Sequence, residues 1–175
     1  MSTNGKLMEM LTGYAASHRH PFNIFVHLIG IPTIMLGVFI PLTWVGLDIG
    51  GVSINLAHLA LFGFFLFYLT LDTLFAVAFL IFGLLAAQLA AYIGELPIAT
   101  AGAIAAAAFF GGYAAQFIGH AVEKSMPVLI KHPIQANLAA PFFTVVEIFK
   151  ILGLRDDLFS EVQRQIEAQR NAPSI

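Results

Sequence analysis

The feature that most constrains this chain is its long central stretch, from Arg19 to Lys124, which has no basic residue inside it. Most of the stretch is apolar, and across the whole chain 59% of residues are hydrophobic and 10% are charged. Soluble domains carry about 25% charged residues. A soluble fold of 175 residues has no interior large enough to hide this much apolar surface. The chain is therefore expected to be an integral membrane protein.

Turn signals divide the apolar stretch into expected membrane-spanning helices. We expect four spans, with approximate ranges 22–47, 54–71, 73–93 and 98–119. Pro32 and Pro41 predict kinks or a break in the first span. The fourth span is rich in Ala and Gly, which let helix backbones approach closely in lipid, so it is expected to be central.

Less apolar segments flank the expected spans. Residues 1–20 have apolar side chains at helical spacing and predict a short interfacial helix. Residues 128–153 predict an interfacial or re-entrant segment, and residues 155–170 predict a polar helix. The expected fold is a single membrane domain, residues 1–175, of the all-α integral membrane class. It is a bundle of about four transmembrane helices with interfacial helices at both ends.

The basic residues indicate how this bundle is oriented. All eight Lys and Arg lie either before the first expected span or after the fourth. Cytoplasmic segments are enriched in basic residues, and an even number of spans puts both ends of the chain on one side. Both termini are therefore expected in the cytoplasm. The Ala-rich fourth span suggests a bacterial inner membrane, or the endoplasmic reticulum membrane if the source is eukaryotic, and leaves a homo-oligomer open.

Several classes of function are excluded by what the sequence lacks. There is no cysteine, which rules out disulfides, thiolate metal sites, iron–sulfur clusters and a cysteine nucleophile. The net charge of −2 predicts no nucleic-acid partner. A Gly-rich phosphate loop and the GxSxG and HExxH motifs are also missing.

Two polar stripes interrupt the apolar background. One has i, i+3, i+7 spacing at the start of the first span: His20, Asn23 and His27. The other has i, i+4, i+7 spacing at the end of the fourth span: Gln116, His120 and Glu123. Each stripe shares one helix face. The expected topology places both at the cytoplasmic end, level with Asp72 in the turn after the second span.

The residue types in the stripes predict a metal site. Imidazole and carboxylate ligands without thiolate suit Fe(II), Zn(II) or Mn(II). Ionisable groups inside a membrane are costly and usually mark function. The expected metal ligands are His20, His27, His120 and Asp72. The competing interpretation is that each histidine makes an interhelical hydrogen bond or lies among lipid headgroups.

Four other polar residues are expected outside this ligand set. His18 precedes the membrane and is one residue off the stripe, so it is expected to be an interfacial or supporting residue. His58 is expected near the opposite end of the bundle as a helix-end histidine. His132 and Glu147 could fold back toward the site, and their roles stay open.

Three motifs along the chain resemble the Mpo1-like family. They are His20-x-x-Asn23-x-x-x-His27-x-x-Gly30-x-Pro32, Gln116-x-x-Gly119-His120-x-x-Glu123-x-x-x-Pro127 and Pro141-x-x-x-x-x-Glu147. The resemblance covers roughly residues 14–150. The two histidine motifs are specific as a pair, whereas either alone would be weak. The family consists of small multi-span proteins, and its yeast member is an Fe(II)-dependent dioxygenase of the endoplasmic reticulum.

The resemblance implies an activity and its partners. The implied reaction is the shortening of 2-hydroxy fatty acids by one carbon, an α-oxidation step in phytosphingosine breakdown. Histidines are tied to iron and activity in the family, which implicates His20, His27 and His120; Asp72 and Glu123 are added by topology alone. The implied partners are Fe(II), O₂, a 2-hydroxy fatty acid whose chain extends between the helices, and membrane lipid.

The implied substrate suggests catalytic roles for polar neighbours of the ligands. Asn23 and Gln116 are expected to orient ligands or to bind the substrate carboxylate. Glu123 is expected beside them at the site. Lys124 is a candidate counter-ion for the carboxylate, although a basic residue at the membrane face is also a topology determinant.

Two other functions stay open at this point. A different metal-dependent lipid enzyme, such as a Zn hydrolase, would use the same residue types. A di-iron hydroxylase usually needs HxxxH and HxxHH boxes, which are missing here. A non-enzymatic lipid-binding or transport protein would use its histidines structurally and would hold little metal.

Overall fold

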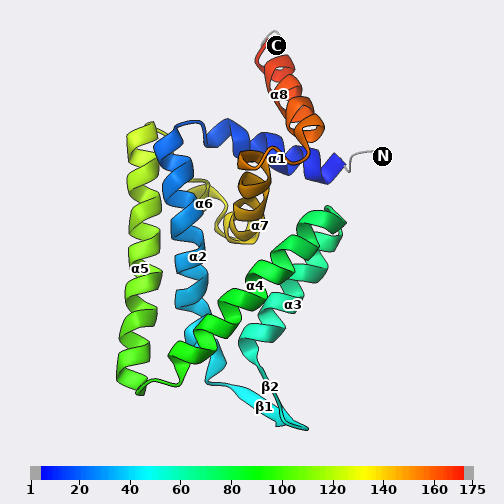
Figure 1. Cartoon of the computed structure of the whole chain (residues 1–175). Coiled ribbons are helices and arrows are strands. Elements are labelled where there is room, and N and C mark those ends of the chain that lie inside the picture. The colour runs from blue at the N-terminus through cyan, green and yellow to red at the C-terminus, as the bar shows by residue number, and fades with distance from the viewer. Residues whose placement is uncertain (1–4, 172–175) are drawn as a thin grey trace.

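The structure is a computed structural model that describes residues 5–171, and Figure 1 shows its helices and one hairpin. Its elements are α1 (Gly5–Ser17), α2 (Pro21–Thr43), β1 (Gly46–Ile49), β2 (Val52–Asn55), α3 (Leu56–Leu69), α4 (Thr73–Gly94), α5 (Ile98–Glu123), α6 (Val128–Lys131), α7 (Pro133–Ile151) and α8 (Asp156–Asn171). The helical membrane class predicted from the sequence is confirmed, with helices at both ends of the chain.

Four helices are long and apolar enough to cross a membrane: α2, α4, α5 and α7. Their number agrees with the sequence, but one member differs. The helix α3 occupies most of the expected second span, yet its 14 residues extend only about 21 Å, less than the roughly 30 Å hydrocarbon core. The helix α7 has 19 residues and lies where an interfacial or re-entrant segment is expected.

The helix α2 lies at the centre of the bundle. It contacts α3, α4, α5 and α7, and it runs through Pro32 and Pro41 as one helix. The Ala-rich α5 is instead peripheral and packs mainly along α2 (Figure 1). Small residues on α5 let its backbone approach α2 closely. The helix α5 is therefore not central in the bundle, contrary to the prediction from the sequence, but packs mainly on one neighbour. A Cβ added at Gly37 would lie 2.6 Å from the backbone nitrogen of Phe109.

The other helices close the space beside α2. The α3–α4 pair is inclined to the α2–α5 pair, and α4 crosses the far end of α2 (Figure 1). The segments α6 and α7 lie beside the other half of α2, and α1 runs across that end (Figure 1). We call this the terminal end, because α1 and α8 both lie there. Residues 141–147 of α7 are buried without interruption.

A β-hairpin lies between α2 and α3, where the sequence indicates only a break, residues 48–53, between the first two expected spans. The strands β1 and β2 pair antiparallel, with Leu47 opposite Ile54. Their two-residue loop is Gly50–Gly51, with φ angles of 61° and 81°. Such primed turns match the twist of the strands and need positive φ, which glycine adopts without a Cβ clash. The Gly-Gly pair between apolar residues was the sequence signal for this hairpin.

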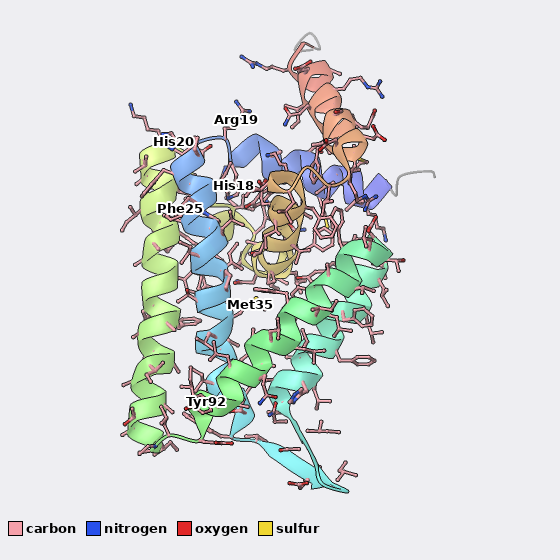
Figure 2. All side chains as sticks on the ribbon, viewed as in Figure 1. His18, Arg19, His20, Phe25, Met35 and Tyr92 are labelled. Atoms are coloured by element: carbon pink, nitrogen blue, oxygen red, sulfur yellow. The ribbon has the colours of Figure 1, made fainter. Side chains whose placement is uncertain are left out.

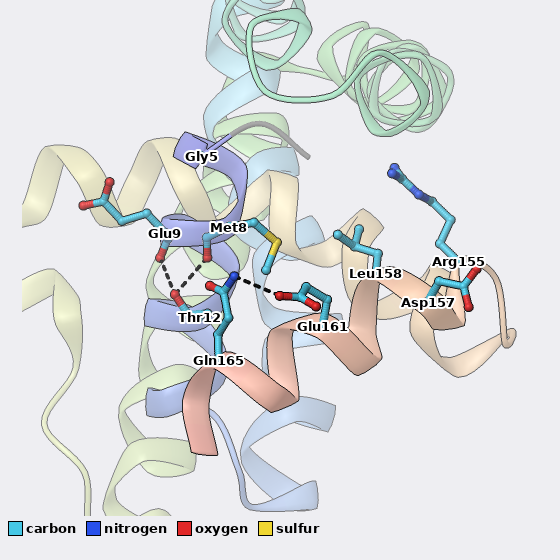
Figure 3. Close-up of a pocket in the computed structure, with 9 residues that line it drawn as sticks. All are labelled: Gly5, Met8, Glu9, Thr12, Arg155, Asp157, Leu158, Glu161 and Gln165. Atoms are coloured by element: carbon cyan, nitrogen blue, oxygen red, sulfur yellow. Dashed lines mark hydrogen bonds between the residues drawn. The ribbon is translucent and has the colours of Figure 1, made fainter. Parts of the chain in front are cut away.

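The polar helix α8 packs on α1 through a small apolar contact. Its Leu158 and Val162 are buried, as are Leu7 and Leu11 of α1. Beside this contact is a pocket of about 820 Å³, shown in Figure 3, whose lining includes Glu9, Asp157, Glu161 and Arg155. None of the histidines lines that pocket. The α1–α8 contact matters for the site because α1 leads directly into His18.

Candidate metal centre

Three buried histidines meet at the terminal end of the bundle: His18, His27 and His120. One ring nitrogen from each lies within 4.8 Å of the others. The three side chains come from separate places: the link between α1 and α2, the second turn of α2, and the last turn of α5. Within residues 5–171, this is the one such grouping of three or more His, Cys, Asp or Glu side chains.

Two of the imidazoles are oriented by backbone carbonyl groups. The Nδ1 of His27 donates to the carbonyl oxygen of Asn23 at 2.9 Å, and the Nδ1 of His18 donates to that of Tyr14 at 3.1 Å. A carbonyl oxygen only accepts, so the proton of each neutral ring is on Nδ1 and the lone pair is on Nε2. Partners of this kind fix the tautomer and the ring plane of metal-binding histidines.

The third imidazole is oriented by the chain that follows α5. Lys124 ends the helix with a left-handed φ of 56°, and the chain turns back. Ser125 thereby reaches His120, with its Oγ 2.9 Å from Nδ1. The other ring nitrogen, Nε2, is left available as a ligand atom. Ser125 is a site residue that the stripes do not predict.

The ring of His18 is also held by stacking. Its centroid lies 3.9 Å from that of Tyr14, and Tyr14 stacks in turn on Phe143 at 3.8 Å. The helix α1 therefore supplies both the hydrogen-bond acceptor and the stacking partner of His18. This contact explains how a residue outside the bundle helices is brought into the site.

The donor set fits a bound cation. The Nε2 atoms of His18 and His27 face each other at 3.3 Å, and with Nδ1 protonated on both rings two lone pairs would be opposed. A proton or a metal ion between them removes this repulsion. Burial, and then the neighbouring His27, lower the pKa of His18 to about 3, so a proton is disfavoured at neutral pH. Three neutral imidazoles instead suit a divalent transition metal.

Two expected ligands lie outside this cluster. His20 is exposed and forms the N-cap of α2, where its Nδ1 accepts from the backbone N–H of Phe22 at 3.2 Å. His18 and His20 lie near the same end of α2 in Figure 2, but only His18 joins His27 and His120. Asp72 is the N-cap of α4. Its carboxylate, which is only partly buried, accepts a 2.6 Å hydrogen bond from Arg155.

Asn23 and Glu123 lie close to the three histidines in the chain, but they do not belong to the cluster. The side-chain amide of Asn23, which is fully buried, donates to one carboxylate oxygen of Glu123. The other oxygen of Glu123 accepts from the backbone N–H of Arg19 at 2.8 Å. Because the Asn23 carbonyl also holds His27, this pair ties the end of α5 to the start of α2. Neither side chain lines the cavity described next.

The remaining expected residues lie in different places. Gln116 faces the cavity one turn below His120. Lys124 is exposed and does not line it. Glu147 is buried in α7 and pairs with Lys150 at 3.5 Å, and His132 is exposed at the junction of α6 and α7. His58 takes part in the capping box of α3 with Asn55.

A cavity of about 770 Å³ extends from the histidines into the bundle. Its volume is in the range of small-molecule sites, about 300–1,000 Å³. Its polar lining includes Gln116 and Tyr113, whose hydroxyl donates to Asn137 at 2.6 Å, and also Lys6 and Glu9 of α1 and Thr70 after α3. Its apolar lining includes Ile31, Met35 and Phe39 of α2, Phe64 of α3 and Phe79 of α4.

Comparisons with known proteins agree with this arrangement. A protein-family model described as "2-hydroxy-palmitic acid dioxygenase Mpo1-like" matches residues 5–151. The 2-hydroxy-palmitic acid dioxygenase MPO1 of Saccharomyces cerevisiae (strain ATCC 204508 / S288c) is 30% identical over 169 residues, which covers 94% of this chain and 92% of the yeast protein. No solved structure matches significantly. All three clustered histidines lie within the matched region.

Proposed function

The chain belongs to the Mpo1-like family, and on that basis we propose that it is an Fe(II)-dependent membrane dioxygenase that shortens 2-hydroxy fatty acids by one carbon. The observation that carries this proposal is the convergence of His18, His27 and His120 in the wall of a largely apolar cavity. A metal site and a fatty-acid site are thereby adjacent.

We assign the metal to His18, His27 and His120. Their Nδ1 atoms are occupied by Tyr14, Asn23 and Ser125, so each ring presents a fixed orientation. Three protein ligands leave coordination positions for a chelating 2-hydroxy carboxylate and for O₂, and bound Fe(II) supplies the redox chemistry that joins them. Asp72 is left out of the ligand set because Arg155 already pairs with it.

The chain's own residues would bind and orient the substrate. Gln116 faces the cavity next to the cluster, where its amide can donate to the carboxylate or the 2-hydroxyl group. Asn23 and Glu123 act as positioning residues through His27 rather than by touching substrate. The buried walls below exclude water from the acyl chain. Lys124 is exposed, which favours its role as a basic residue at the membrane face.

The proposed reaction balances without an external reductant. A 2-hydroxy acid and one O₂ yield the acid one carbon shorter, carbon dioxide and water. The bond between the carboxyl carbon and the hydroxyl-bearing carbon breaks. The substrate loses four electrons, which reduce the O₂.

The positive-inside distribution of basic residues supports a cytoplasmic location for the site and for both termini.

The test combines metal content with O₂ uptake on protein purified gently in detergent and reconstituted with Fe(II). The wild type should hold near-stoichiometric iron and consume O₂ with 2-hydroxypalmitate but not with palmitate. His120→Ala should lose both properties, since one of its ligands is removed. His132→Ala is the matched control, because His132 is exposed and lies outside the cluster. It should keep both.

Other outcomes separate the competing functions. Full activity in His120→Ala would contradict the proposal. Tightly bound zinc that Fe(II) does not replace, with no O₂ uptake on any hydroxy acid, would favour a hydrolase. Failure of the wild type to bind any transition metal would favour a lipid-binding or transport protein with structural histidines.

A further inference from the structure

We propose that the cavity below the histidines is an acyl-chain site that selects substrates by length, and that Phe39 forms its far end. The inference rests on the proposed function only for the position of the substrate's carboxylate and 2-hydroxyl group at the histidines. The position of the substrate's acyl chain is assigned from the lining and the extent of the cavity, which are independent of the chemistry at the metal.

The length of the site follows from the face that α2 presents to the cavity. His27, Ile31, Met35 and Phe39 recur every four residues, and all four line it. Phe39 lies twelve residues beyond His27, which is about 18 Å along a helix. In Figure 2, Met35 lies partway down α2 from His18. The α2 side of the cavity therefore has a metal-ligand end and an aromatic end.

An alkyl chain of defined length fits this distance. With bonds of about 1.52 Å and angles of about 111°, an extended chain advances roughly 1.25 Å per carbon. A length of about 18 Å then holds roughly 14 carbons. Two more carbons, the carboxyl and the hydroxyl-bearing carbon, would lie at the histidines. The site thus matches an unbranched acid of about 16 carbons.

The wall opposite α2 is largely apolar. Phe79 is fully buried, with its ring centroid 6.2 Å from that of Phe64 and 4.6 Å from that of Tyr68. On α5 the lining residues extend only from Tyr113 to His120. Polar side chains from that helix therefore stay near the histidines. A chain that passes beyond them meets phenylalanine and aliphatic side chains.

The chemistry of such a wall predicts a binding profile. Burial of each additional methylene improves affinity about fourfold while the chain still finds space. Affinity should rise in this way up to about 16 carbons and then stop rising, because Phe39 blocks further entry.

The measurement is competition against a radiolabelled 2-hydroxypalmitate probe. Unlabelled saturated 2-hydroxy acids of increasing length are added to iron-loaded protein under anaerobic conditions, so that nothing turns over.

Two opposite substitutions test the end of the site. Phe39→Ala removes the end wall, and the ratio of affinities for 20-carbon and 16-carbon acids should rise about fourfold for each methylene that the vacated space admits. Met35→Phe adds bulk partway down, and the break in the profile should move to shorter chains. Phe75→Ala is the matched control. Phe75 is as buried as Phe39 but does not line the cavity, so its loss should leave the profile unchanged.

Three results would overturn the inference. They are absence of saturable binding in the wild type, an unshifted profile in Met35→Phe, and an equal shift in Phe75→Ala. If Phe39→Ala does not fold, Met35→Phe decides, because it adds atoms rather than a void. Failure of the proposed reaction is distinguishable. A length profile that shifts as expected, without O₂ uptake in air, would keep the acyl site and reject the dioxygenase.

Discussion

At the residue scale, the site depends on how each imidazole is turned. Two of the three Nδ1 atoms are held by carbonyl groups one helical turn earlier in the chain, Tyr14 for His18 and Asn23 for His27. Asn23 has a second role, since its amide binds Glu123 at the end of α5. A single asparagine therefore connects the orientation of one clustered histidine to the helix that carries another. Its loss would leave a partly buried carboxylate oxygen of Glu123 without its partner.

The two histidines before α2 make a direct test at this scale. His18→Ala should abolish stoichiometric metal binding, because a ring nitrogen of the cluster is lost. His20→Ala should keep the metal and lower stability by about 1 kcal/mol at most, because His20 is an exposed N-cap. Metal analysis and thermal unfolding in detergent measure both effects. The reverse pattern, with metal lost only in His20→Ala, would show that His20 and not His18 binds the metal.

At the element scale, the close contact of α2 and α5 sets the distance between His27 and His120. A Cβ added at Gly112 would lie 2.6 Å from Cγ1 of Ile34 and 2.9 Å from the carbonyl oxygen of Gly30. Gly111, the preceding residue, has nothing within 4 Å of its own Cβ position. The glycines are adjacent in sequence but differ in what an added methyl group would meet.

Alanine substitution at these glycines should therefore have opposite effects. Gly112→Ala should destabilise the protein by about 1–3 kcal/mol, because it pushes the two helices apart, and should weaken metal binding. Gly111→Ala should be neutral or stabilising by up to about 1 kcal/mol, since alanine favours helix. Thermal unfolding and metal titration in the same detergent compare the two. Equal destabilisation by both would show that α2 and α5 are less closely packed than described.

At the scale of the whole molecule, α1 and α8 lie at one end and the β-hairpin lies at the other (Figure 1). The chain has no cysteine, so single cysteines can report on each end without background. Ser53, in β2, and Ser160, in α8, are both exposed. They form a matched pair for labelling with a membrane-impermeant maleimide.

The positive-inside distribution predicts which cysteine reacts in intact cells. Ser53→Cys should be labelled from outside the membrane, and Ser160→Cys only after the membrane is permeabilised. In a eukaryotic source the same test applies to sealed microsomes, where Ser160→Cys should react and Ser53→Cys should be protected. Labelling of both positions from one side would contradict the arrangement of helices around the bundle.

The sequence by itself determined the membrane class of this protein and two of its three clustered histidines. Long segments without charge require lipid, because no soluble fold of this size buries them. Histidines inside such segments are costly, which singled out His27 and His120. Helical spacing placed Gln116 next to His120, where it faces the cavity. These inferences hold because composition and periodicity act locally, along one helix at a time.

Only the tertiary structure decided the third clustered histidine, the partner of Asp72 and the lining of the cavity. Helical spacing relates His20 to His27, but α2 begins at Pro21 and His20 is in extended conformation with ψ of 126°, so the periodicity stops before it. His18 enters the site because α1 folds back across the bundle. Asp72 meets Arg155 from 83 residues away. Contacts of this kind depend on how helices pack against each other, and no spacing within a single helix encodes them.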